Sequence, residues 1–515
     1  MMKKIFYILA LTLVASALLI ASCKRSFLDV PVQGKTTEEQ ALIDPEAANK
    51  LVVGAYNNLY LPGTVGFKLV VLADVTSDDS DKGSVASDPG FDGIFLDNFN
   101  YNSNTSIFND VWVDNYKGIT SANKALSVLE KSTIDVAIRD RLSGEARFIR
   151  ALLYFNMVRE FGGVVKLTTT PTLAEANNPE FQTRATKEEI YKVITDDLLF
   201  GIDHLPAKKD PGAIVGRATK GAAQALLSKV YLYQKNWQGA YDMSKAVMTS
   251  NNYSLAPVYA DIFREKGANN DESIFEVQTG PYANQTSGGL ACDAVSKNYS
   301  NFQGPRGSFT SQTIGGQTYS AGDLGFGLNT PTADLAAAYE PGDVRKAGTI
   351  IFTSDVSTTT LWDGFVIPKR PDVVGERYNY KGYHSPFLET QSCGGINDKD
   401  NKPKNIRIIR FAEVLLINAE AAAHLGQDAK TPLERVRTRA GLTTTSATIA
   451  DIWKERRLEL AMEADRFFDL VRTGQAASVM NALGKPFVTG KHEVFPIPQQ
   501  QRDFSGGRLT QNPNY

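Results

Sequence analysis

The clearest hydrophobic pattern in the chain lies between Asp451 and Gly474. Apolar side chains recur there at i, i+3, i+4 and i+7, which predicts one face of a single helix about six turns long. They are Trp453, Leu460, Ala461, Ala464, Phe467, Phe468 and Val471. Asp451 can cap the start of this helix, and Gly474 follows its last turn. Arg457 falls within the apolar stripe, so we expect it to extend its charged end to solvent or to pair with a carboxylate.

Helical patterns of this kind form two groups, one before position 250 and one after position 406. The first group predicts helices at 44–60, 107–129, 143–161 and 186–205, followed by a helix–turn–helix at 219–250. Thr186 and Glu189 form a capping-box pattern at the start of one of them. The helix–turn–helix has a partial tetratricopeptide-type spacing, carried by Leu227, Ser228, Tyr231 and Ala240. The second group predicts helices at 407–425, 431–439 and 451–474.

The segment between these groups, 251–405, has little helical periodicity. Residues 273–278 alternate like a strand, and much of the rest is rich in Gly, Ser, Thr and Asn, with aromatic residues at intervals. A second irregular stretch with aromatics spans 62–104. A loop region as long as 251–405 is usually functional in a compact protein. Because stacked helix pairs bury one another's apolar faces, we expect the insertion to cap one surface of a helical superhelix.

The N-terminus predicts export. A basic start, MMKK, precedes an apolar stretch from Ile5 to Ile20, which is short for a membrane-spanning helix and typical of a signal peptide. The stretch ends in Ile20-Ala21-Ser22-Cys23, a pattern similar to a bacterial lipobox. Cleavage after residue 22 would leave Cys23 for acylation, and several acyl chains would hold the protein on a membrane. An ordinary signal peptide followed by a coincidental cysteine is the alternative.

Composition argues against several classes of function. The net charge is −2, and removing Lys3 and Lys4 from the 55 basic side chains leaves 53 against 57 acidic ones, a net of −4. Without a block of basic residues, we do not expect nucleic acid as a partner. The three cysteines and four histidines are scattered, so we expect no structural zinc site and no cofactor.

The sequence offers weak support for catalysis. Glu455, Glu459 and Glu463 lie one turn apart on the predicted helix, whereas hydrolytic carboxylates face each other across a bound sugar. We interpret these three as a solvated face or as structural ion pairs. The acidic residues 78, 79 and 81 resemble part of a calcium loop, but Lys82 occupies a ligand position and Pro89 replaces the closing glutamate. A polar loop is the simpler interpretation.

Several long motifs in order resemble the SusD/RagB family of nutrient-binding outer-membrane lipoproteins. They are Phe27-Leu28-Asp29 after the lipobox, GEARFIRALLYFNMVREFGGV (144–164), LLSKVYLYQKNWQGAYDMSKAVM (226–248), IRFAEVLLINAEAAAHLG (409–426), ERRLELAMEADRFFDLVRTG (455–474), and a tail containing FPIP and LTQNPNY. The resemblance runs from Cys23 to Tyr515.

The resemblance implies a mainly α fold, a tetratricopeptide-like right-handed superhelix of about four helix pairs with an inserted loop-rich capping subdomain containing short strands. The corresponding divisions are a signal peptide at 1–22, an N-terminal region with three helix pairs at 23–250, the cap at 251–405, and a C-terminal helix pair with an extended tail at 406–515. The resemblance also implies glycan binding without catalysis, an outer-membrane location facing the cell exterior, and delivery of the ligand to a SusC-like TonB-dependent transporter.

Aromatic and acidic residues of the irregular regions are the candidate ligand contacts. Sugar rings have apolar C–H faces that stack on aromatic side chains, and their hydroxyls bond to polar ones. The candidates are Asp78, Phe95, Tyr101, Tyr282, Tyr299, Phe302 and Trp362. Helical Trp112, Tyr116 and Trp237 are expected to be packing residues. A surface glycan-degrading enzyme and a tetratricopeptide-type scaffold that binds proteins are the alternative functions.

Overall fold

The computed structural model describes residues 37–88, 92–172, 174–279, 299–320, 322–391, 395–397 and 402–515. The signal peptide, Cys23 and Tyr282 lie outside these residues. Within them, no helix has the length and apolar character needed to cross a membrane.

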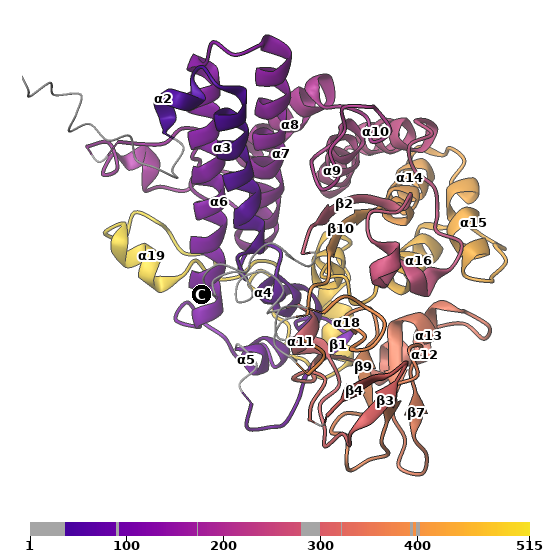
Figure 1. Cartoon of the computed structure of the whole chain (residues 1–515). Helices are drawn as coiled ribbons and strands as arrows, with labels where there is room; N and C mark the ends of the chain where they lie inside the picture. Colours follow the sequence, from indigo (N-terminus) through magenta and orange to yellow (C-terminus); the bar gives the residue numbers. More distant parts are fainter. Residues whose placement is uncertain are drawn as a thin grey trace, which may run out of the picture.

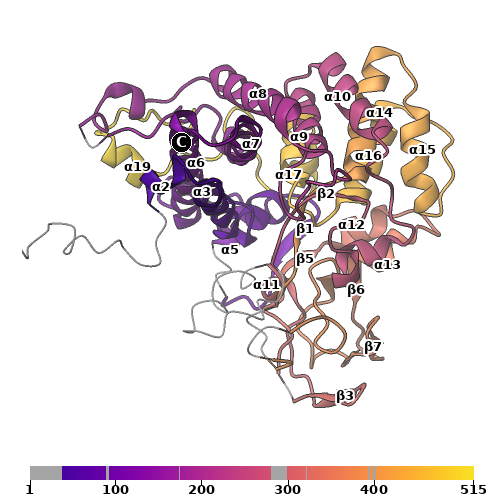
Figure 2. The same cartoon turned by 45° about the horizontal axis from the view of Figure 1, so that its top comes forward.

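Four pairs of helices form the scaffold, as predicted. The pairs are α3 (Pro45–Asn57) with α6 (Ser106–Lys131), α7 (Val136–Phe161) with α8 (Lys187–His204), α9 (Lys220–Tyr233) with α10 (Trp237–Thr249), and α14 (Phe411–Leu425) with α16 (Ile449–Leu460). Contacts between α6 and α7, α8 and α9, and α10 and α14 join successive pairs. Figures 1 and 2 show the pairs following one another around the upper part of the molecule. The chain therefore has a helical tetratricopeptide-like fold.

Local signals explain several helix starts. The Thr186 hydroxyl accepts a hydrogen bond from the Glu189 backbone N–H (3.2 Å), and the Glu189 carboxylate accepts one from the Thr186 N–H (2.9 Å). This confirms the predicted capping box. Asp44 caps α3 by accepting from the Glu46 N–H, and Pro45 occupies the first helical position.

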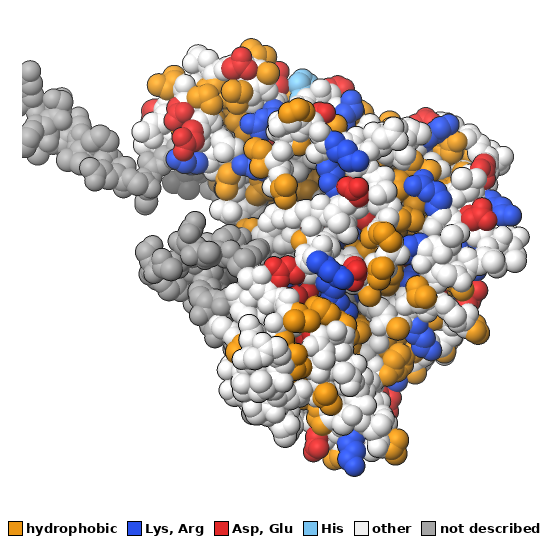
Figure 3. Space-filling view, turned by 45° about the vertical axis from the view of Figure 1, so that its right-hand side comes forward, with side chains coloured by type: hydrophobic (Ala, Val, Ile, Leu, Met, Phe, Trp, Pro, Cys, Tyr) orange, Lys and Arg blue, Asp and Glu red, His pale blue; other side chains and the backbone are white. Residues whose placement is uncertain are grey.

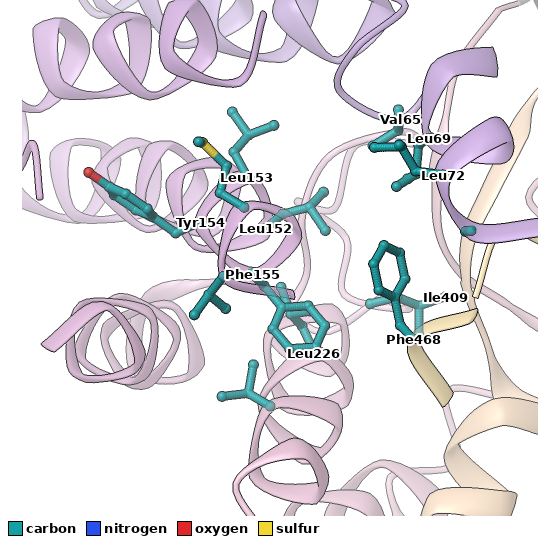
Figure 4. Close-up of a cluster of buried hydrophobic side chains, with 14 of the residues drawn as sticks. Val65, Leu69, Leu72, Leu152, Leu153, Tyr154, Phe155, Leu226, Ile409 and Phe468 are labelled. Atoms are coloured by element: carbon teal, nitrogen blue, oxygen red, sulfur yellow. The ribbon is translucent and has the colours of Figure 1, made fainter. Parts of the chain in front are cut away.

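One hydrophobic core joins parts of the chain that are far apart in sequence. Figure 4 shows Leu152 and Phe155 of α7 and Leu226 of α9 near side chains of the N-terminal irregular segment and of the C-terminal region. That segment contains α4 (Phe67–Val70), a π-helical turn (Val71–Val75) and α5 (Gly93–Asp97). Ile409 lies on strand β10 (Ile406–Arg410) and Phe468 on α17 (Arg466–Arg472). The 62–104 stretch is therefore built into the scaffold.

The single helix predicted for 451–474 is wrong. The segment contains α16 and α17, separated by a break in which Met462 and Ala464 have positive φ values of 65° and 61°. The Ala464 N–H donates to Asp74 (3.1 Å), so a tertiary contact replaces the helical one. Thr448, rather than Asp451, caps α16, and Asp451 completes its capping box.

A second correction concerns the helix predicted from 407. Residues 406–410 form β10, which pairs antiparallel with β2 (Ser273–Val277), and the helix begins at Phe411. Strand β2 falls within the residues predicted to be a strand. The pairing attaches the start of the insertion to the last helix pair. Three further helices, α15 (Lys430–Arg439), α18 (Ala476–Ala482) and α19 (Gln499–Phe504), complete the C-terminal region.

The rest of the insertion forms a loop-rich lobe below the scaffold in Figure 1. Its described elements are α11 (Ser300–Gln303), α12 (Ala333–Ala338), α13 (Arg345–Thr349) and short antiparallel strand pairs. The pairs are β3 (Gln312–Ile314) with β4 (Gln317–Tyr319), β6 (Ile350–Phe352) with β9 (Arg377–Asn379), and β7 (Thr359–Thr360) with β8 (Val366–Ile367). Strand β5 (Leu328–Pro331) pairs with β1 (Ser80–Gly83) of the N-terminal irregular segment. The lobe has its own hydrophobic cluster, which includes Phe365, Tyr378 and Tyr383.

Candidate functional site

Three of the predicted ligand contacts are buried packing residues. Asp78 is 1% exposed, and both its carboxylate oxygens accept from the Arg466 guanidinium at 2.8 Å. Burial opposes the charge of this carboxyl, but Arg466 and Arg457 nevertheless hold the pKa of Asp78 below its usual value. Tyr101 packs against Phe108 and Phe495.

Phe302 is 8% exposed and packs against Phe67 in the main core. Because burial leaves these three side chains almost no surface, direct ligand contact by Asp78, Tyr101 and Phe302 is not supported. The calcium-like pattern near Asp78 has the same explanation, since Asp79 pairs with Arg457. Among the described residues, no group of three or more His, Cys, Asp or Glu side chains is placed to hold a metal ion.

Tyr299 lines a cavity of about 60 Å³ between the scaffold and the insertion. The cavity wall includes Lys229 of α9, Arg410 of β10 and the segment between α16 and α17. Lys229 is bonded there to Glu413 (2.9 Å) and Asp465 (3.0 Å). These buried ion pairs already satisfy the charged groups, so the cavity is a poor place for a chain of sugars.

Phe95 and Trp362 are the two described candidates that remain exposed, at 41% and 39%. Phe95 lies on α5, whereas Trp362 lies at the end of the β7–β8 hairpin. The structure therefore does not gather the predicted residues into one site. On the face shown in Figure 3, acidic and basic side chains are interspersed over the scaffold, while the lower lobe is mostly uncharged. That lobe is the more suitable surface for an uncharged, hydroxyl-rich ligand.

A tight turn fixes the backbone at Trp362. The Leu361 N–H donates to the Phe365 carbonyl (2.8 Å), and the Gly364 N–H donates to the Leu361 carbonyl (3.0 Å). Gly364 has φ of +87°, a conformation that glycine adopts without strain. The turn leaves Trp362 exposed at its second position, between buried Leu361 and buried Asp363.

Two tyrosine hydroxyls, one on a partly buried and one on a buried side chain, hydrogen-bond to this turn. The Trp362 N–H donates to the Tyr380 hydroxyl (2.8 Å), and the Tyr383 hydroxyl donates to the Asp363 carboxylate (2.7 Å). Burial, and then the Asp363 charge, raise the pKa of Tyr383 well above its usual value, so the phenol remains a donor. Phe365, on the far side of the turn, is fully buried.

A guanidinium lies against the same aromatic groups. Arg264 follows a short 3₁₀ segment, Tyr259–Phe263, and its guanidinium carbon is 5.0 Å from the Trp362 ring centre and 4.3 Å from that of Tyr380. We name Trp362, Tyr380 and Arg264 the aromatic platform. It presents an indole ring on a rigid turn, which suits stacking on an apolar sugar face.

Trp362 was among the predicted ligand contacts, whereas Tyr380 and Arg264, which contact it, were not. Tyr380 was visible only as one of many loop aromatics, and Arg264 carries no local signal because its role depends on residues from a distant hairpin.

The carboxylates on α16 have structural roles. Glu459 is fully buried and bonds to Arg345 (3.1 Å), Arg410 (3.0 Å) and Arg439 (2.5 Å). Glu455 pairs with Arg345, and Glu463 follows α16 and pairs with Arg410 and Lys381. The ion-pair interpretation is confirmed for all three, and the solvated face is not. Arg457 pairs with carboxylates as expected. Trp237 is a packing residue and stacks on His424.

Two family profiles together match most of the chain. One, described as "Starch-binding associating with outer membrane", matches residues 38–232, and another, described as "SusD family", matches residues 262–515. The chain belongs to the SusD/RagB family. A SusD-like protein from Bacteroides ovatus is 26% identical over 491 residues, covering 90% of this chain and 81% of the relative.

Solved SusD-like structures share the fold. A laminarin-binding SusD-like protein is 29% identical, with a TM-score of 0.75, and the match covers 91% of this chain and 99% of that one. Surface glycan-binding protein A from Bacteroides thetaiotaomicron, solved with laminarihexaose, has a TM-score of 0.74 at 24% identity, covering 92% and 100% of the two chains. At 24% identity, the comparison with surface glycan-binding protein A shows a shared fold and no more.

Proposed function

We propose that this SusD/RagB member is a non-enzymatic lipoprotein that binds a glycan at the outer membrane and delivers it to a partner TonB-dependent transporter. Family membership supports the membrane association and the class of ligand. The lipobox supports an anchor at Cys23, which lies outside the described residues.

The observation that carries the proposal is the exposed Trp362 side chain, on a hairpin turn held in place by hydrogen bonds to Tyr380 and Tyr383. An indole offers a large flat apolar surface and loses little conformational entropy when a ligand stacks on it. Its backbone is already fixed by the turn and by Tyr380. Pre-organisation of this kind lowers the cost of binding. Phe95 is a second exposed aromatic for which we propose a ligand contact, at a separate place on the surface.

Laminarin is the first ligand to test. A solved relative at 29% identity bears the name laminarin-binding SusD-like protein. Starch-like glycans, pectin and chitin fragments form the rest of the panel.

The test uses the soluble form that lacks residues 1–23. Isothermal titration against the panel should give saturable binding of at least one glycan, and Trp362→Ala should weaken it at least tenfold, about 1.4 kcal/mol. The matched control is Phe504→Ala, because Phe504 is also highly exposed but lies on α19, away from the lobe. The melting temperature should change little in either variant.

Two results would contradict the proposal. Release of new reducing ends from a glycan during incubation would favour the surface enzyme. Absence of any glycan binding, together with stable capture of protein partners alone, would favour the protein-binding scaffold. Co-purification with a TonB-dependent transporter from detergent-solubilised outer membranes tests the delivery step.

A further inference from the structure

Arg264 is buried in an unusual setting. Arg264 is 3% exposed, and its guanidinium lies over two aromatic rings, those of Trp362 and Tyr380. Its Nη1 donates to the Tyr380 carbonyl (3.1 Å). No ion pair found among the described residues includes Arg264, although the charges of Glu389 and Asp363 act on it from farther away. This contrasts with Arg345 and Arg410, which each contact two or more carboxylates.

Burying a guanidinium without an ion pair is costly. Burial indeed lowers the pKa of Arg264 from its usual value, and Tyr380 and Glu389 oppose that effect. Cation–π contacts with two rings and one carbonyl hydrogen bond compensate for the lost water. Packing alone does not explain an arginine at this position, because a buried methionine would fill the same space without the free-energy cost of removing a charge from water.

The backbone of Arg264 makes hydrogen bonds of its own, independent of the side chain. Its carbonyl accepts from the Arg407 guanidinium (3.0 Å) on β10, and its N–H donates to the Asp261 carbonyl. The Arg407 bond attaches the segment to β10, whereas the Asp261 bond stays within the segment, and neither involves the Arg264 side chain. The side chain contributes at the platform, where it connects a segment on the scaffold to the hairpin that carries Trp362.

We propose that Arg264 is the positioning residue of the glycan-binding surface, holding the Trp362 indole in one orientation with its outer face open to the ligand. The inference rests on the proposed function of Trp362. Covering one face of the indole leaves a single face for stacking, and fixing the ring removes the rotamer entropy that a free tryptophan would lose on binding. A planar guanidinium can stack on both rings at once, which a lysine ammonium does not do.

The experiment compares Arg264→Met and Arg264→Lys with wild type in the soluble protein. With laminarihexaose, or the glycan of the panel that binds best, both variants should bind at least fivefold more weakly. In the Trp362→Ala background the Arg264→Met effect should fall to less than twofold, because a positioning role requires the ring. Lys346→Met is the matched control, since Lys346 lies over exposed Phe352 elsewhere on the lobe (5.6 Å).

Acrylamide quenching of tryptophan fluorescence provides a readout that needs no ligand. The difference between wild type and Trp362→Phe isolates the Trp362 signal from Trp112, Trp237 and Trp453. Both Arg264 variants should make that signal more accessible to quencher. Circular dichroism and the melting temperature verify folding, and Arg264→Lys serves if the methionine variant does not fold.

Unchanged affinity with unchanged quenching would overturn the inference, as would an equal loss of affinity with and without Trp362. If no glycan binds, the proposed function fails, and the quenching comparison alone decides whether Arg264 orients the indole.

Discussion

Arg456, near the end of α16, donates to the Asp465 carboxylate at 2.7 Å across the break that precedes α17. Asp465 also contacts Arg159 of α7 (2.7 Å) and Lys229 of α9 (3.0 Å). One carboxylate therefore connects three of the four helix pairs. Arg456 and Asp465 are buried, so these two charged residues of 451–474 face inward, where they connect the helix pairs.

Asp465→Asn should lower the free energy of unfolding by about 3 kcal/mol, because buried Arg159 loses its carboxylate partner and Lys229 and Arg456 each lose one of theirs. Chemical denaturation at pH 7 measures the loss. Asp196→Asn is the control, since Asp196 pairs with Lys192 on the exposed side of α8 and should contribute about 0.5 kcal/mol or less. A loss as small as the control's would contradict the network's role.

The same cluster predicts acid sensitivity. Burial opposes ionisation of Asp465, but Lys229, Arg456 and Arg159 more than compensate, so the pKa of Asp465 lies below its usual value. A carboxyl with a lowered folded pKa contributes stability above its unfolded pKa near 4, and that contribution is lost as the pH falls toward the folded pKa. Asp465→Asn should therefore flatten the decline of stability below pH 4.

Glu160 should affect the pH dependence of stability in the opposite direction, with a loss of stability at high pH. It is fully buried on α7, and neither of its carboxyl oxygens has a hydrogen-bond partner among the described residues. Burial raises the pKa of Glu160 to about 8, against the opposing charge of Arg159. Its contribution to stability is present below the unfolded pKa near 4.3 and is lost as the pH rises from there through about 8.

Glu160→Gln should make the free energy of unfolding less dependent on pH between 5 and 9, and the variant should be more stable than wild type at pH 9. Denaturant titrations across this range provide the measurement. Burial also raises the pKa of Asp74 to about 8, so some slope should remain. A slope identical to that of wild type would show that Glu160 is ionised in the folded protein.

Phe95→Ala should reduce glycan affinity two- to fivefold and leave the melting temperature unchanged, because an exposed side chain contributes little packing, typically within about 0.5 kcal/mol. Titration with the best ligand from the panel measures the effect. Wild-type affinity in the variant would restrict the binding surface to the neighbourhood of Trp362.

Cys23→Ala should move the full-length protein from the membrane fraction to the soluble fraction, because the acyl chains would have no attachment point. Cys393→Ala is the matched control and should remain in the membrane. Fractionation followed by immunoblotting distinguishes the two. Continued membrane attachment of Cys23→Ala would exclude the lipid anchor.

Local signals in the sequence predicted the helical scaffold well. Asp44-Pro45 and Thr186 with Glu189 carry their own start signals, and both helices begin where those residues predict. The break after α16 was not predictable in this way. Its apolar spacing continues through the break, and the contact that bends the chain comes from Asp74, a residue far away in the sequence.

In the candidate site, too, the sequence predicted local features but not the contacts between distant segments. Loop context identified Trp362 and Phe95 as exposed aromatics, but it also selected Tyr101 and Phe302, which fill the core. Composition describes a neighbourhood along the chain, whereas burial depends on which segments meet in space. Asp78 illustrates this best, because an acidic loop residue looks solvated until Arg466 is placed beside it.

Throughout the described residues, every β-sheet has only two strands. A change in one hairpin therefore has no third strand through which to alter the register of its neighbours. The β7–β8 hairpin meets the rest of the lobe mainly through side chains such as Tyr380 and Tyr383. Its outward-facing residues, Trp362 among them, are therefore the positions to vary when new specificities are grafted onto the lobe, while Leu361, Phe365 and Ile367 stay in the lobe's hydrophobic cluster.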